Sequence, residues 1–107
     1  MLGWGGAATD AIFVLQPVLM TYSGKGEGDY NYGRYSNPKL DALTQKAKIE
    51  MNGEARLVYI QEALAAHNAD INHLPLHRQV IPWATRGNVT AVHLANNFVN
   101  PYWIKIQ

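Results

Sequence analysis

The sequence predicts a mixed α/β (α+β) domain in which a helix hairpin packs on short strands. Two central stretches, about residues 37–52 and 53–71, carry apolar residues at helical spacing behind helix-start signals. After residue 72 the pattern changes to short apolar segments punctuated by prolines, and the closing stretch "PYWIKIQ" alternates as a strand does. A chain of 107 residues is expected to form a single domain.

The two central helices are predicted from their caps and their apolar faces. Asn37 is expected to cap the first helix, and Pro38 to occupy its first position, where a missing N–H has no consequence. Asn52 and Gly53 end that helix and open the next one. Two helices joined by a short turn pack as an antiparallel hairpin. We expect one core to form from Leu40, Leu43, Ala47, Leu57, Ile60 and Leu64, with Ile71 continuing the second stripe.

The segments before the hairpin are predicted to be shorter. Residues 2–4 could end a strand, and Thr9 could cap a helix with Asp10 in its first turn. The apolar helical segment that follows contains Pro17, which removes a backbone hydrogen bond, so we expect a kink or two short pieces. Residues 22–35, rich in glycine and tyrosine, are predicted to form a loop.

After the hairpin, the expected elements are strands. A strand is predicted through about residues 79–85, and residues 89–92 could form another short one. The alternation that follows Pro101 predicts a last strand at the end of the chain.

Composition narrows the classes of function. The formal net charge of +1 and the scattered basic residues indicate no nucleic-acid partner. The absence of cysteine removes disulfides, thiolate catalysis and Cys-based zinc sites, and it leaves the compartment open. The apolar run at residues 11–20 contains Pro17 and follows Asp10 with no basic residue before it, so we do not expect a secretory signal within this chain.

Few residues indicate chemistry. His67, His73 and His77 are close in the sequence, but Pro75 separates the last two, and the first two do not share a helix face. We therefore predict no metal site and no cofactor. The carboxylates show no acid–base pairing, and no serine has a partner histidine or a nucleophile elbow, so we predict that the chain is not an enzyme.

The stretch "GWGG" admits two interpretations. The glycines could form a tight turn beneath a core tryptophan, or they could let backbone and indole approach a ligand closely. The ordered set "GWGG", "YSNPKLDALTQKA" and "EARLVYIQEALAAHNADINHLPLHRQVIPWATRG" resembles the C-terminal part of an extracytoplasmic solute-binding protein. The family is the peptide/nickel type, which includes the dipeptide- and oligopeptide-binding components of ABC importers. The resemblance extends from about residue 2 to residue 87.

This resemblance implies a Venus-flytrap fold, in which two α/β lobes enclose a ligand. The chain would supply a C-terminal fragment of one lobe, with residues 1–87 as lobe core and residues 88–107 as a return segment and terminal strand. Its partners would be a small-molecule or peptide ligand and, through the parent protein, an ABC permease in the membrane. The implied location is periplasmic or extracellular and membrane-associated.

The resemblance also implies a ligand-binding segment made of Trp4, Gly5, Gly6, Ala7 and Asp10. Several peptide-binding members have an aspartate three residues after the tryptophan, where it holds the α-amino group of the ligand. Here that position is Ala7, and the first carboxylate is Asp10. The ligand is therefore left open between a peptide-like solute and a sugar, an amino-acid derivative, an opine or a modified peptide.

Two other classes remain in view. The chain could be a stand-alone structural or interaction domain with no small-molecule ligand, in which "GWGG" is only a turn. A small hydrolase is the third class and has the least support. If the chain is a lobe fragment, its exposed strand edges are expected to favour a homodimer, with the closing segment "PYWIKIQ" as the pairing element.

Overall fold

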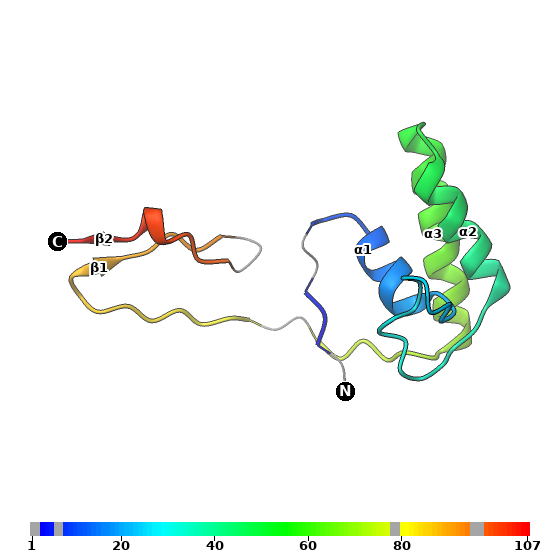
Figure 1. Ribbon diagram of the computed structural model, residues 1–107, viewed down its shortest axis with the longest axis horizontal. Helices are drawn as coiled ribbons and strands as arrows, with labels where there is room; N and C mark the ends of the chain where they lie inside the picture. The colour runs from blue at the N-terminus through cyan, green and yellow to red at the C-terminus, as the bar shows by residue number, and fades with distance from the viewer. Residues whose placement is uncertain (1–2, 6–7, 78–79, 95–97) are drawn as a thin grey trace. The chain divides into compact units, whose positions relative to one another are not determined.

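The computed structural model describes residues 3–5, 8–77, 80–94 and 98–107 and divides into two compact units. Met1–Pro75 contains the long helices, and Leu76–Gln107 contains a small antiparallel sheet (Figure 1). The mixture of helices with a two-stranded sheet agrees with the predicted α+β class in general. Each unit is described by itself below.

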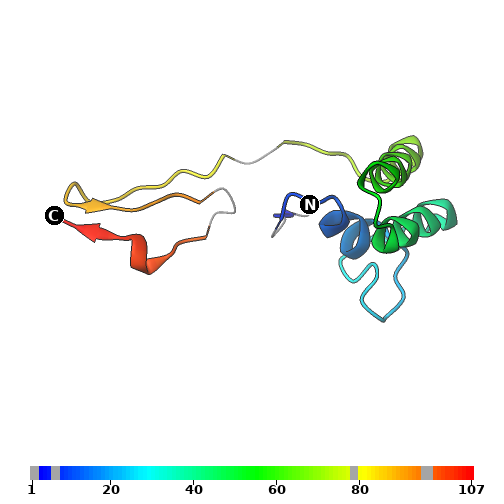
Figure 2. The ribbon, with the colours of Figure 1, turned by 90° about the horizontal axis from the view of Figure 1, so that it is seen from above.

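The hairpin consists of α2 (Pro38–Ile49) and α3 (Gly53–Asp70), which lie side by side in both ribbon views (Figures 1 and 2). The Asn37 side chain accepts hydrogen bonds from the backbone N–H groups of Lys39 and Leu40, and Pro38 opens the helix. Asn52 caps α3 in the same way. The predicted cap at Asn37 and the predicted change of helix at Asn52 and Gly53 are confirmed. Both depend on residues within one turn of a helix start.

The predicted break at Pro17 is also confirmed. A short helix α1 (Ile12–Val14) passes into a π-helical turn η1 (Leu15–Leu19) that contains Pro17. In a continuous α-helix the Phe13 carbonyl would accept from the backbone of residue 17, and proline has no N–H to give. The cap differs from the prediction: the side chain that accepts from the first turn, at Ile12 N, belongs to Asp10 and not to Thr9.

The core of the helical unit lies between η1 and the inner faces of α2 and α3. Its buried apolar residues are Leu15, Val18, Leu19, Met20, Leu40, Leu43, Ala47, Ile60 and Ala63. Within the described part of Met1–Pro75 no strand is assigned, and the hairpin contacts α1 and η1. In this unit the hairpin therefore packs on α1 and η1, and the short strands belong to Leu76–Gln107.

The buried face of α3 is rotated from the predicted stripe. Leu57 is 53% exposed and Ile71 lies beyond the helix end, whereas Ile60, Ala63 and His67 are buried and Leu64 is partly buried. Ala47 and Ala63 are both fully buried, which is consistent with a close approach of the two helix backbones at these small side chains. The larger Leu57 is consequently turned outward.

The second unit contains β1 (Val89–Thr90) and β2 (Lys105–Ile106), paired antiparallel with Val89 opposite Ile106. Pro101–Trp103 forms a short 3-10 turn, η2, instead of the first half of the predicted terminal strand. Residues 80–85 form no strand, and Gln79 lies outside the described residues. At the N-terminus, Gly3 and Trp4 are not in a strand, and Leu2 is likewise not described.

Replacing Ile60 with alanine should reduce the free energy of unfolding by about 2–5 kcal/mol, because it removes a buried side chain from the seam between the helices. Leu57→Ala is the matched control and should cost about 0.5 kcal/mol or less, since its side chain is largely exposed. Chemical denaturation of both variants measures the difference. Equal losses of unfolding free energy in the two variants would contradict the placement of Ile60 on the buried face of α3.

Candidate functional site

Trp4 is held at the surface of the helical unit by its indole N–H. Nε1 donates to the Phe13 carbonyl at 2.9 Å. In a regular α-helix this carbonyl would accept from the backbone N–H of residue 17, which proline lacks. The residue is 39% exposed, so it lies at the surface and not in the core. Because the N–H is engaged, the ring surface and edges are the parts of the indole available to another molecule.

Two tyrosines from the loop extend the aromatic surface that begins at Trp4. The Tyr30 ring lies 5.0 Å from the Trp4 ring in an edge-to-face arrangement, and the Tyr32 ring lies 6.3 Å from that of Tyr30. All three side chains are exposed. We call Trp4, Tyr30 and Tyr32 the aromatic row. The tyrosine-rich composition of residues 22–35 was the only sequence signal for it, and the composition did not reveal which rings would meet.

The loop that carries the tyrosines is fixed by backbone hydrogen bonds to the π-helical turn. Gly28 N donates to the Gln16 carbonyl and Tyr30 N to the Pro17 carbonyl, both at 2.9 Å. Gly28 has φ +63°, and a Cβ built on it would lie 2.5 Å from the Met20 carbonyl oxygen. Only glycine meets both requirements, so this residue sets the path of the loop.

Asn31 fastens the other side of the same loop. Its side chain is buried, and Nδ2 donates to the carbonyls of Met20 and Tyr35 at 2.9 and 2.7 Å. Oδ1 accepts from Tyr35 N at 3.0 Å. A buried amide with its donors and acceptor satisfied holds the neighbouring Tyr30 and Tyr32 in register with Trp4.

The glycines beside Trp4 leave room around it. A Cβ at Gly3 or Gly5 would meet no atom of the described residues within 4 Å, and neither residue has a left-handed φ. Their effect here is therefore open space rather than a turn that only glycine can form. Gly6 and Ala7, which were predicted to contact ligand, lie outside the described residues.

Asp10 has both carboxylate oxygens engaged within the chain. Oδ1 accepts from Ile12 N at 2.9 Å, and Oδ2 forms an ion pair with Arg56 Nη2 at 2.7 Å. The Ile12 N–H first, and then Arg56, lower the pKa of this carboxyl group. Arg56 also donates to the Ala47 carbonyl, so Asp10 joins α1 to the hairpin. A shallow hollow of about 360 Å³ beside it is lined by Thr9, Asp10, Ala11, Arg56, Leu57 and Ile60.

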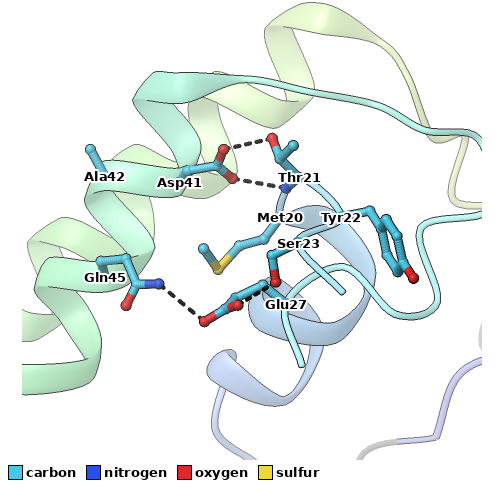
Figure 3. Close-up of a pocket in the computed structure, with 8 residues that line it drawn as sticks. All are labelled: Met20, Thr21, Tyr22, Ser23, Glu27, Asp41, Ala42 and Gln45. Atoms are coloured by element: carbon cyan, nitrogen blue, oxygen red, sulfur yellow. Dashed lines mark hydrogen bonds between the residues drawn. The ribbon is translucent and has the colours of Figure 1, made fainter. Parts of the chain in front are cut away.

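A second hollow of about 330 Å³ lies between the loop and α2 (Figure 3). Its lining residues are Met20, Thr21, Tyr22, Ser23, Glu27, Asp41, Ala42 and Gln45. Asp41 accepts from Thr21 N and Oγ1 at 2.9 and 2.6 Å, and Glu27 accepts from Ser23 Oγ at 2.6 Å. The Ser23 hydroxyl is the main cause of a lowered pKa at Glu27. These carboxylates bind the loop to α2.

Two other features, a metal site and a membrane-spanning helix, are absent from the described residues. Among the residues that the structure describes, no three histidine or carboxylate side chains gather in a way that could hold a metal ion. No helix in the described ranges is long and apolar enough to cross a membrane. Comparison of the chain with models of protein families, with curated proteins and with solved structures gives no significant match.

Gly28→Ala should destabilise the chain by more than about 1–2 kcal/mol, the cost of a left-handed conformation, because the new methyl group also meets the Met20 backbone. Gly33→Ala in the same loop is the control and should have little effect, since a Cβ there meets nothing within 4 Å. Thermal or urea unfolding decides between them. A Gly28→Ala variant as stable as Gly33→Ala would contradict this path of the loop.

Proposed function

We propose that the chain is part of the solute-binding component of an ABC importer and presents the aromatic row to a peptide-like or other small polar solute. The observation that carries the proposal is the row itself. Three large aromatic side chains stand exposed and in mutual contact beside residues that leave the space around Trp4 open. Contiguous exposed aromatic surface is a common mark of binding sites, and tyrosine adds a hydroxyl that can hydrogen-bond the bound molecule.

Rigidity supports a binding role for this surface. Trp4 is fixed by its bond to the Phe13 carbonyl, and Tyr30 by its backbone bond to Pro17. A preorganised surface loses little side-chain entropy when a solute binds. The aromatic residues would then supply contact area, and polar groups elsewhere in the site would orient the solute.

Asp10 has a positioning role in this proposal. Its carboxylate already accepts from Ile12 N and Arg56, so it is not poised to receive a ligand ammonium group. Together with alanine at position 7, this favours recognition by stacking over recognition of a peptide amino terminus. Solutes with flat or ring-shaped apolar faces fit such a surface.

The mechanism follows from the Venus-flytrap fold that the sequence resemblance implies. The solute would be enclosed between this segment and a second lobe, and contacts formed only in the closed state would drive closure. The closed protein would then deliver the solute to a membrane permease. A periplasmic or extracellular location belongs to the same proposal.

Trp4→Ala should weaken solute binding at least about fivefold, or about 1 kcal/mol, the scale of one aromatic contact. Isothermal titration with tri-alanine, and separately with a glucose trisaccharide, measures the change. Trp103→Ala removes an exposed tryptophan in the other unit and is the control. The proposal would be contradicted if both variants and the unaltered chain had equal dissociation constants. It would also be contradicted if the unaltered chain bound neither probe.

One observation favours the alternative of an interaction domain. None of the described residues in Leu76–Gln107 is buried. Its largely exposed apolar side chains include Leu76, Val80, Tyr102 and Ile106. A two-stranded ribbon is marginally stable at best by itself, so these side chains call for a partner surface. A second copy of the chain, paired along β2, would meet that need.

In this alternative the chain sediments as a dimer at micromolar concentration, and Ile106→Lys shifts it toward monomer because it places a charge on the pairing strand. Ile49→Lys is the matched control: Ile49 is 79% exposed but lies at the end of α2 in the helical unit. Sedimentation equilibrium distinguishes the two variants. A monomeric, cooperatively folding chain would contradict dimerisation.

A further inference from the structure

His67 occupies an unusual position at the end of α3. The residue is 5% exposed, and its Nδ1 makes no hydrogen bond to any residue that the structure describes. The Tyr35 ring lies edge-on to the imidazole at 5.4 Å, and the His73 ring lies 5.0 Å away on another side. Burying an imidazole in this way costs far more when the ring is charged than when it is neutral.

His73 reaches His67 because the helix ends with a reversal. α3 stops at Asp70, and Ile71 adopts a left-handed conformation with φ +50°. The chain therefore turns back, and a residue that shares no helix face with His67 comes to lie against it. The sequence spacing alone argued against this meeting.

The same helix end is clamped to the loop and to α2. Asp70 accepts from Tyr35 Oη at 2.6 Å and from Asn37 Nδ2 at 2.7 Å. Asn37 is also the cap of α2, and the Tyr35 backbone is bonded to the buried Asn31. One carboxylate and one buried imidazole thus lie at the point where the loop and both long helices join.

Burial and the neighbouring His73 oppose protonation of the His67 imidazole. Burial is the largest cause that lowers the pKa of His67, repulsion from His73 adds to it, and Asp70 acts in the opposite direction. Hydrogen bonds from Tyr35 and Asn37 lower the pKa of Asp70, so the acceptor stays ionised. Burial raises the pKa of Tyr35, with Asp70 and, from α2, Asp41 contributing, so its hydroxyl stays a donor.

We infer that His67, His73, Tyr35 and Asp70 form a proton-sensitive latch that holds residues 31–37 against the end of α3 and loosens when His67 takes up a proton. A charged imidazole would have to move toward water, away from His73 and from beneath the Tyr35 ring. Movement of Tyr35 would break its bonds to Asp70 and to Asn31.

The direction of the pH effect follows from linkage. The ordinary pKa of histidine is 6.5 and that of folded His67 is lower, so the unfolded chain takes up this proton first as the pH falls. Stability from the latch is complete above about pH 6.5 and is lost between that value and the lower folded pKa. If the aromatic row binds solute as proposed, the same proton would loosen Tyr30 and Tyr32 through Asn31. The latch itself does not depend on that function.

Imidazole NMR of the full chain tests the latch directly. We expect the His67 imidazole, identified by its loss in His67→Phe, to titrate below pH 6.5, and its midpoint to rise in His73→Gln, where the repelling charge is gone. Amide exchange at Asn31 and Tyr35 should accelerate with the same midpoint. A His67 midpoint at or above pH 6.5 would overturn the inference. Amide exchange rates at Asn31 and Tyr35 that do not change with protonation of His67 would overturn it as well.

Urea unfolding at pH 7.5 and 5.0 provides an independent readout. The denaturation midpoint of the unaltered chain should fall at the lower pH, and His67→Phe should remove at least half of that fall because the variant has no imidazole at the buried position. His77→Phe is the matched control: His77 is exposed, and its variant should keep the full fall. Identical falls in all three proteins would overturn the latch. Should His67→Phe not fold, the imidazole signal of His67 is assigned in the unaltered chain through its own backbone resonances, and its midpoint decides.

Discussion

The missing N–H of Pro17 is the constraint on which the helical unit depends. A proline at this point ends α-helical bonding and widens the next turn into η1. Three backbone carbonyls then accept hydrogen bonds from other segments. The Phe13 carbonyl accepts from the Trp4 indole N–H, the Gln16 carbonyl from Gly28 N, and the Pro17 carbonyl from Tyr30 N. One break in a helix therefore brings together segments that are distant in sequence.

The aromatic row is a consequence of that break. Trp4 is bonded to the Phe13 carbonyl in α1 and Tyr30 to the Pro17 carbonyl in the adjoining η1, and their rings meet at the surface rather than in the core. A core position would have satisfied the hydrophobic effect for Trp4 more fully. Holding three aromatic side chains in water is unfavourable unless another molecule covers them, which is the physical basis of the proposed binding role.

Asn31 and Tyr35 connect this surface to the far end of the hairpin. Asn31 is satisfied by Met20 on one side and Tyr35 on the other, and Tyr35 in turn bonds Asp70. The loop is thus held at three places by backbone or buried polar groups and by few apolar contacts. Such a segment depends on hydrogen-bond geometry, and a change of charge next to Tyr35 acts on the whole of it. The latch and the aromatic row are two ends of one hydrogen-bonded loop.

The sequence by itself determined the features that depend on near neighbours. Asn37 with Pro38, Asn52 with Gly53, and the break at Pro17 follow from backbone bonds within one helical turn, and all appear as predicted. The inner stripe of α2 followed in the same way from its periodicity. These predictions succeed because the partner of each group lies within a few residues.

Tertiary structure decided what depends on distant partners. The face of α3 turned to bury Ala63 in place of Leu57, and no local pattern could fix that rotation. Residues 80–85 have the composition of a strand, but a strand exists only where another chain segment completes its hydrogen bonds, and none pairs with them in the described part of the unit. The ring contacts of Trp4 with Tyr30 and of His67 with His73 form only because the chain reverses direction between them. Spacing along the sequence did not predict either contact.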